Sequence, residues 1–173
     1  MQRDLSYPVS YFILDAARTG SQLEMAREMN KNHLSLYSDK NERYLAQVAP
    51  YIFTVPVDPG FSSWVREHGW RRAWGIFVSA DISLENLYFH FRKFVRVQTQ
   101  DGEEFYFRFY DPRVLKMFLP TCDKKQVIEF FGPVKSFTVE GDTKNEAVRF
   151  WHENGLLKQQ ELTADEIFGE KVI

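Results

Sequence analysis

An Asp-Gly pair at residues 101–102 separates two strand-like runs, and this feature most constrains what the chain can fold into. The run FVRVQTQ precedes the pair and EEFYFRFY follows it. Asp and Gly tolerate the positive φ that tight hairpin turns require, so the pattern predicts a β-hairpin. Alternation along the second run gives one face suited to a core and one amphipathic face. The first face carries Phe105, Phe107 and Phe109, and the second carries Tyr106, Arg108 and Tyr110.

An Asp-Pro step follows the hairpin and predicts a change from strand to helix. Asp111 precedes Pro112. A residue before proline avoids the helical conformation, proline suits the first helical turn, and the Asp side chain can cap that turn. The predicted helix VLKMFL ends at Pro120. A second predicted helix begins at Asp123, in a capping-box spacing, and ends at Gly132.

Hydrophobic spacing predicts the remaining elements of the first 140 residues. Apolar runs predict strands at SYFILDA, HLSLY, APYIFTVPV, WGIFVSAD and VKSFTVEG, with VKSFTVEG as the last strand. Pro56 confines the third of these to an edge of the sheet or to an end of the strand. Helical spacing and capping signals predict helices from Ser21 to about Asn30, across SSWVREHG and across SLENLYFHFRKF.

The C-terminal residues are predicted to be helical. Thr143 and Glu146 have the spacing that opens a helix, here across AVRFWHEN to Gly155, and Thr163 opens a final short helix. LLKQQEL between them is predicted to be a flexible link. The expected fold class is α+β: a mixed, largely antiparallel sheet with a central β-hairpin, flanked by helices, and a short helical C-terminal segment. Residues 1–140 are expected to form the α+β domain, and residues 141–173 a short helical C-terminal extension of the same domain.

Composition indicates a folded chain without a strong charge preference. The 173 residues are 44% hydrophobic and 16% aromatic, and the net charge is −2. Such a chain has no overall field that attracts nucleic acid or an anionic membrane. The apolar run near the N-terminus is too short for a signal peptide or a membrane span. The single cysteine, Cys122, excludes an internal disulfide framework. Together with the short apolar run, it leads us to expect a cytoplasmic location without membrane insertion.

No sequence pattern predicts a catalytic, cofactor or metal site. The four histidines lack ligand spacing, and no P-loop, GxGxxG or GxSxG motif occurs. Cys122 is a candidate nucleophile and Asp111 a candidate general base. A lone cysteine beside a helix cap is more typical of a small buried hydrophobe, and a carboxylate before proline already has a capping role. We therefore expect a protein that is not an enzyme and that needs no cofactor or metal.

Arginines and aromatic residues interleave in HFRKFVRV and FYFRFYDPR. Aromatic side chains on neighbouring strands with arginine between them are typical of surfaces that stack single-stranded nucleic acid. The hairpin tip, however, is Asp-Gly-Glu-Glu, and the Gly-containing RNA-recognition signature does not occur. The other interpretation is a hydrophobic sheet whose arginines lie against aromatic faces or pair with carboxylates. A small nucleic-acid-binding module that uses the Arg/aromatic hairpin therefore stays the alternative function.

Four segments resemble the adaptor or effector-chaperone family of bacterial type VI secretion, of Tap/TEC type. These segments are YFILDAAR, WGIFVSA, LYFHFRKFVRVQTQDGEEFYFRFYDPRVLKMFLP and EFFGPV, which lie between about Tyr11 and Glu140. The local patterns above indicate that most of the signature residues determine folding. They are Trp74, Gly75, His90, Arg92, Arg96, Arg108, Tyr110, Asp111, Pro112, Arg113, Phe131, Gly132 and Pro133.

The resemblance implies a cytoplasmic, non-enzymatic protein that binds a cognate secreted effector, a toxin encoded nearby. It further implies that the protein helps to load this toxin onto a spike protein of VgrG type. Many relatives are longer, with a helical lobe after the FFGPV block, whereas about forty residues follow that block here. If that lobe contacts cargo in the relatives, this chain must bind its cargo through another surface or bind a different kind of cargo.

An adaptor of this kind needs an exposed apolar or aromatic surface that shields a segment of its cargo. A group of aromatic residues around a glycine-containing loop is the candidate for partner binding, because aromatic side chains are frequent interface anchors. The group consists of Phe61, Trp64, Trp70 and Trp74. The alternative is that these tryptophans cover the sheet, since large aromatic residues are also common in cores.

Overall fold

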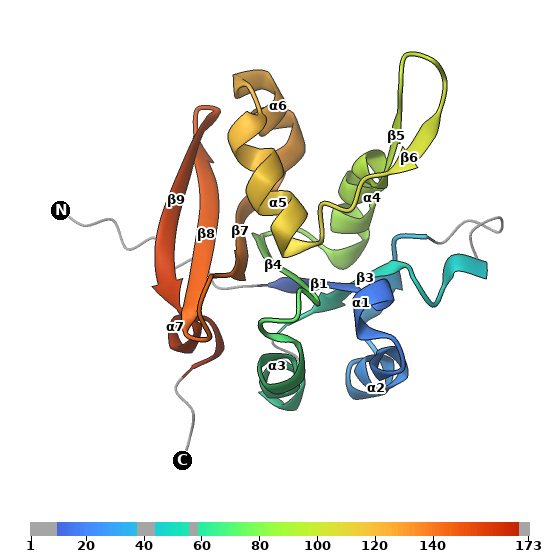
Figure 1. Ribbon diagram of the computed structural model, residues 1–173, viewed down its shortest axis with the longest axis vertical. Coiled ribbons are helices and arrows are strands. Elements are labelled where there is room, and N and C mark those ends of the chain that lie inside the picture. The colour runs from blue at the N-terminus through green and yellow to red at the C-terminus, as the bar shows by residue number, and fades with distance from the viewer. Residues whose placement is uncertain (1–9, 38–43, 56–58, 170–173) are drawn as a thin grey trace.

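Seven strands form one antiparallel sheet in the order β2-β3-β1-β4-β7-β8-β9, and helices pack around it (Figure 1). The computed structural model describes residues 10–37, 44–55 and 59–169. The strands of this sheet are β1 Tyr11–Asp15, β2 His33–Ser35, β3 Pro50–Thr54, β4 Gly75–Ala80, β7 Val134–Glu140, β8 Glu146–Glu153 and β9 Leu156–Thr163. A separate two-stranded sheet contains β5 Arg96–Gln98 and β6 Glu104–Tyr106.

The helices lie on both sides of the central strands. They are α1 Ala16–Thr19, α2 Gln22–Met29, α3 Pro59–Trp64, α4 Leu84–Val95, α5 Pro112–Phe118, α6 Lys124–Phe131 and α7 Ala164–Phe168. A π-helical turn, Val65–Gly69, continues α3, and a 3-10 turn, Leu119–Thr121, continues α5. Figure 1 shows α1, α2 and α3 on one side of β1 and β3, with α4, α5 and α6 on the other.

The central strand β1 is buried along its whole length, which explains its unbroken apolar sequence. It pairs with β3 on one side and β4 on the other, so it has no exposed edge. Its side chains alternate between the two faces of the sheet, and all five are buried. Phe12 packs on Phe77 of β4 with ring centroids 4.7 Å apart. Four of the predicted strands are confirmed here: SYFILDA contains β1, HLSLY contains β2, WGIFVSAD contains β4 and VKSFTVEG contains β7.

The α+β class, the largely antiparallel sheet and the flanking helices are confirmed, as is the hairpin around Asp101 and Gly102. The hairpin, however, belongs to its own small sheet and not to the large one. Its second strand ends at Tyr106, so the strand expected to continue to Tyr110 is too long. Phe105, predicted to face the core, is exposed because the hairpin stands apart from the large sheet, whereas Phe109 is buried in the turn that follows β6.

The predicted helix across AVRFWHEN and the predicted link at LLKQQEL are both wrong, because these segments form β8 and β9. VKSFTVEG is therefore not the last strand. The residues pair because β8 buries Ala147 and Phe150 beside β7, and a tight turn at Asn154 and Gly155, both with positive φ, returns the chain as β9. The short helix after Thr163 is confirmed as α7. The division into residues 1–140 and 141–173 stays a prediction.

Two further predictions concern β3 and α2. The strand predicted at APYIFTVPV is confirmed as β3. It lies between β2 and β1, so it is not an edge strand, and it ends at Thr54, before Pro56, which lies outside the described residues. The helix expected from Ser21 is confirmed as α2, but the Ser21 side chain makes no capping hydrogen bond. The capping box at Asp123 is confirmed in full, with Gln126 as its second member.

Candidate functional site

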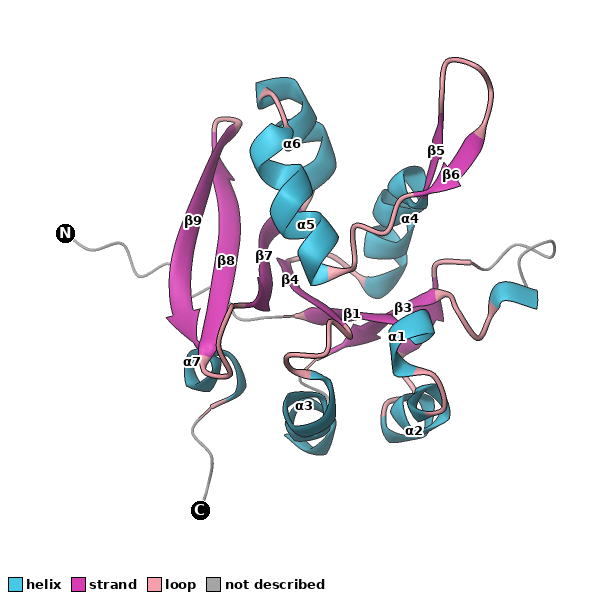
Figure 2. Cartoon of the chain, viewed as in Figure 1, coloured by secondary structure: helices cyan, strands magenta, loops and turns pink. Residues whose placement is uncertain are grey.

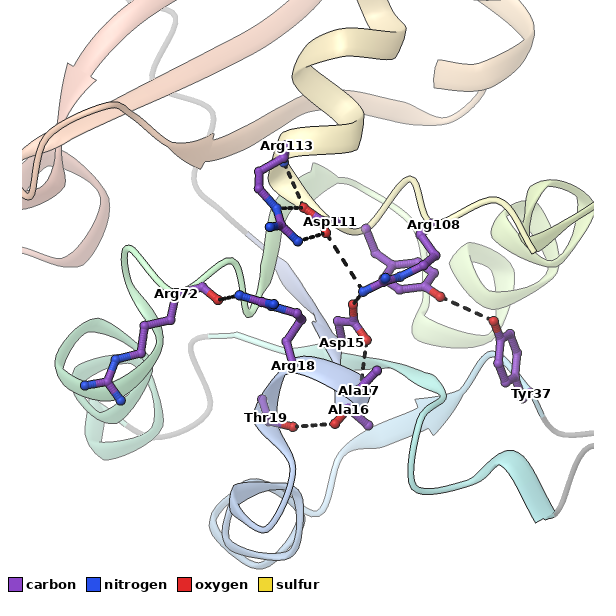
Figure 3. A network of polar contacts seen from close by, with 11 residues as sticks. Asp15, Ala16, Ala17, Arg18, Thr19, Tyr37, Arg72, Arg108, Asp111 and Arg113 are labelled. Atoms are coloured by element: carbon purple, nitrogen blue, oxygen red, sulfur yellow. Dashed lines mark hydrogen bonds and ion pairs between the residues drawn. The ribbon is translucent and has the colours of Figure 1, made fainter. Parts of the chain in front are cut away.

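The signature segment that surrounds Asp111 forms a network of charged side chains where α5 meets β1 (Figure 3). Asp111 caps α5: its Oδ1 accepts from the backbone N of Arg113 at 2.9 Å. The Arg113 guanidinium folds back onto the same carboxylate, with Nε 3.0 Å from Oδ1 and Nη2 2.6 Å from Oδ2. The Asp-Pro prediction is therefore confirmed, including the cap. Because Asp111 is 2% exposed, its charge depends on these partners.

Arg108 joins this cap to the end of the central strand. Its Nη2 binds Oδ2 of Asp15, which is completely buried, and lies 3.9 Å from Oδ2 of Asp111. Asp15 in turn caps α1, where its Oδ1 accepts from the backbone N of Ala17 at 3.0 Å. One arginine thus bridges two buried carboxylates that each begin a helix.

The two carboxyl groups have pKa values shifted in opposite directions. Burial raises the pKa of Asp15 above its usual value, although the hydrogen bond and charge of Arg108 act against this shift. Burial also favours the neutral form of Asp111, but Arg113 outweighs it with its hydrogen bonds and charge, so the pKa of Asp111 lies below its usual value. Asp111 is therefore held ionised by structural partners.

Tyr110 and Tyr37 extend the network toward β2. The two hydroxyl groups lie 3.3 Å apart, and Tyr110 is buried. Burial and the neighbouring Tyr37 raise the pKa of Tyr110 far above its usual value, so its hydroxyl stays protonated. The network thus connects three parts that are distant in the sequence: β1, the segment after β2, and the loop that leads from β6 into α5.

Several other signature residues support close approaches between backbone segments. The His90 Nε2 lies 2.8 Å from the carbonyl oxygen of Phe130, and burial lowers the pKa of this histidine. The His90 ring occupies the space that a side chain on Gly132 would need, 2.4 Å from the position of its Cβ. Gly75 has the same restriction, since a Cβ there would lie 2.0 Å from the carbonyl oxygen of Ile13. These positions explain why the pattern requires glycine.

Arg92 and Phe131 also have structural contacts, whereas Pro133 is exposed. The Arg92 Nη1 donates to the carbonyl oxygen of Leu36 at 2.5 Å. Phe131 is buried and packs on Phe137 with ring centroids 5.0 Å apart. Arg96 is exposed at the start of β5. Pro112 is buried at the start of α5. Most of the signature residues therefore connect one element of the fold to another.

The structure brings three of the four residues predicted to bind a partner together: the Trp64 ring lies 6.0 Å from that of Phe61 and 5.1 Å from that of Trp74, centroid to centroid. Phe61 and Trp74 are buried in the core, whereas Trp64 and Trp70 are partly buried against it. Trp70 donates from its indole nitrogen to the carbonyl oxygen of Lys144 at 3.1 Å, and its ring packs on Phe168. Partner binding by this group stays a prediction, and burial restricts the accessible members to Trp64 and Trp70.

Sequence reasoning missed two acidic residues that organise the fold. Asp15 is one, and Glu140 at the end of β7 is the other. The buried Glu140 carboxylate accepts from the backbone nitrogens of Arg71 and Ala73, at 2.7 and 3.1 Å, and both of these residues have positive φ. A carboxylate as the last residue of a mostly buried strand was the available signal, because such a charge is buried with the strand end and needs partners.

The described residues contain no group of three or more His, Cys, Asp or Glu side chains that could hold a metal ion. Burial raises the pKa of the Cys122 thiol, which disfavours the reactive thiolate. Among the helices of the described residues, none has the length and apolar character needed to cross a membrane. The charged groups of the network are already engaged with one another, so the arrangement can connect elements and position a surface.

The fold and the network define an α+β protein whose charged signature residues connect its strands and helices. The family model described as "Domain of unknown function (DUF4123)" matches residues 10–129, which is more than half of the chain. The chain therefore belongs to the DUF4123 family, which is associated with adaptor and chaperone proteins of type VI secretion. No curated protein and no solved structure matches it.

Proposed function

We propose that this protein is a non-enzymatic adaptor that binds a cognate type VI effector and helps to load it onto a VgrG-type spike. The observation that carries the proposal is the family match over residues 10–129. It covers β1, the hairpin, the Asp111 cap and most of α6. The adaptor acts in the cytoplasm, before the toxin is secreted.

The engagement of the charged signature residues supports a binding role rather than a catalytic one. Both carboxylates of the network contact arginine and also cap a helix. A general base needs an oxygen that can reach a substrate proton, and a completely buried side chain such as Asp15 offers none. Exposed apolar side chains, among them Phe89 and Phe105, supply surface that can contact another polypeptide.

Co-expression with the toxin encoded beside this chain tests the proposal. A tagged adaptor should retain the toxin through purification, and a toxin from an unrelated locus should be lost. The VgrG-type spike from the same locus should join the complex only when the toxin is present. Failure to retain the adjacent toxin, with the adaptor shown to be folded, would contradict the proposal.

Salt dependence separates this function from nucleic-acid binding. Contacts to several phosphates make affinity fall by orders of magnitude between about 50 and 200 mM salt, because counterions are released on binding. Capture of a toxin mainly through apolar contacts should weaken far less over this range. Single-stranded DNA of mixed sequence serves as the second probe, and salt-sensitive binding of that DNA without toxin capture would favour the alternative function.

A further inference from the structure

The β5–β6 hairpin projects from the body of the protein beyond α4 (Figure 2). Its strands form a two-stranded sheet of their own, and every residue of β5 and β6 is exposed. An isolated two-stranded hairpin is only marginally stable in water, because too little apolar surface is buried. A partner that covers this hairpin would therefore add stability to it by burying its apolar side chains.

The two faces of the hairpin differ in what they contact. The pairing sets Val97 opposite Phe105 on one face and Arg96 opposite Tyr106 on the other. Tyr106 packs on Tyr37 with ring centroids 4.8 Å apart, so its face turns toward the body. On the other face, Val97 is 42% exposed and Phe105 is 51% exposed.

The exposed face continues into the aromatic core. Phe107 donates its backbone N–H to the carbonyl oxygen of Val95 at 2.9 Å, which extends the hairpin pairing by one step. Phe107 therefore falls on the same side as Phe105, two residues away. Its ring packs on Phe118 of α5, with centroids 4.7 Å apart, and both rings are partly buried. We call these four side chains, Val97, Phe105, Phe107 and Phe118, the hairpin strip.

Acidic side chains surround the tip of the hairpin. Asp101, Glu103 and Glu104 are exposed, and the segment from 97 to 107 contains no lysine or arginine. The Thr99 N–H donates to the carbonyl oxygen of Glu103 at 2.9 Å, so the pairing continues and Glu103 shares the face of Phe105. An apolar strip next to a negative tip is complementary to a segment that carries apolar side chains beside positive ones.

We propose that the hairpin strip is the docking site for a segment of the cognate effector that presents apolar residues next to lysine or arginine. The inference rests on the proposed function and names the surface that performs it. A second copy of this chain is a poorer occupant, since a symmetric contact through the strip would bring two acidic tips to one interface. The exposed Val97 and Phe105 side chains anchor the segment, and the acidic tip selects for its positive charge.

The test uses the adaptor co-expressed with the toxin encoded beside it, and affinity is measured with the purified full chains. The double variant Val97→Ser/Phe105→Ser removes the exposed apolar pair. We expect it to weaken toxin binding by about tenfold or more, as expected for loss of central apolar anchors. Leu156→Ser is the matched control, because Leu156 is 61% exposed at the other hairpin, between β8 and β9. The control should bind like the parent chain.

A charge variant, Glu103→Lys/Glu104→Lys, tests the second half of the proposal. It should weaken binding and reverse the response to salt, because attraction at the tip becomes repulsion. Hydrogen exchange supplies a readout without mutation: the amides of residues 96–106 should become protected when the toxin binds. Because this measurement uses the parent chain, it still tests the docking site if a variant lowers the thermal stability of the adaptor.

The possible failures have distinct meanings. If the parent chain does not bind the toxin, the proposed function fails. If it binds and both variants bind equally well, with unchanged exchange in residues 96–106, the docking site is wrong and the function stands. If light scattering finds a dimer that Val97→Ser/Phe105→Ser dissociates, the strip belongs to a second copy and the proposal is overturned.

Discussion

The Asp111 carboxylate caps α5 and contacts two guanidinium groups, those of Arg113 and Arg108. Replacement by alanine removes the cap of α5 and leaves Arg113 without its partner. We expect Asp111→Ala to lower the free energy of unfolding by about 2 kcal/mol, because loss of a cap alone costs about 1 kcal/mol and the buried charge contacts add to it. Asp111→Asn should lower the free energy of unfolding by a smaller amount, since asparagine also caps helices. Urea denaturation measures both, and equal stability of the three proteins would contradict this role.

The lowered pKa of Asp111 predicts how that loss depends on pH. A carboxylate whose pKa is lower in the folded state adds stability above its unfolded pKa, and this stability is lost as the pH falls through the folded pKa. The difference in unfolding free energy between the parent chain and Asp111→Asn should therefore be largest near pH 7 and shrink below about pH 4. Asp142→Asn, at a side chain that is 96% exposed, is the control. A difference that stays constant down to pH 3 would assign the effect to packing instead of charge.

The sequence predicts interactions between neighbouring residues better than those between distant ones. The caps at Asp111 and Asp123 involve atoms two or three residues away, so a motif specifies them. Arg108 and Asp15 are 93 residues apart, and their pairing follows from the strand order of the sheet. The Arg/aromatic pattern indicated an arginine with a carboxylate partner, but only the fold determines which carboxylate that is.

At the scale of elements, the predicted C-terminal helix is wrong because the spacing of Thr143 and Glu146 occurs in a turn between strands as well as at a helix start. Thr143 and Glu146 do interact, with the Thr143 N–H donating to Oε2 of Glu146 at 3.0 Å, but the contact closes the turn between β7 and β8. The decisive signal was Asn154-Gly155, a pair that favours a tight hairpin as strongly as Asp-Gly does. Flanking strands with a polar outer edge, such as β9, lack the apolar alternation that reveals a strand.

Two glycines at hairpin turns allow the contribution of the β8–β9 turn to be measured. Gly155 and Gly102 have nearly the same φ, +83° and +85°. A Cβ at Gly155 would lie 2.9 Å from the carbonyl oxygen of Lys124 in α6, whereas nothing lies within 4 Å at Gly102. Backbone strain should lower the free energy of unfolding of both alanine variants by about 1 kcal/mol. Gly155→Ala should lose clearly more in total, because its Cβ also clashes with Lys124. Equal losses in thermal or urea unfolding would mean that the turn does not pack on α6.

At the scale of the whole molecule, the sequence established the α+β class but not the order of the strands. Apolar runs identify strands that are buried on both faces, such as β1 and β4, without stating which strands are neighbours. The hairpin illustrates the difference: its turn was predicted from two residues, while its position outside the large sheet depends on how α4 and α5 pack. The structure therefore reveals most about surface strands and long-range ion pairs, which the sequence does not predict.

The sheet extends beyond residue 140, so the final strands should be necessary for folding of the whole. Removal of residues 141–173 takes away β8 and its pairing with β7, including the contact between Phe137 and Phe150. It also uncovers Phe77 and Trp70, which pack on Phe168. Each large apolar side chain that loses its cover costs about 1.5–3 kcal/mol, so a few of them approach the 5–15 kcal/mol that typically stabilises a domain.

We therefore expect a chain of residues 1–140 to lack cooperative thermal unfolding, as measured by circular dichroism and calorimetry. The control is the full chain with residues 98–104 replaced by Asn-Gly, which shortens the β5–β6 hairpin and leaves the seven-stranded sheet intact. That control should unfold cooperatively, near the temperature of the parent chain, because its loss is confined to exposed residues. A truncated chain that unfolds cooperatively at the parent temperature would establish residues 141–173 as a separable unit, and would place all of the cooperative core before β8.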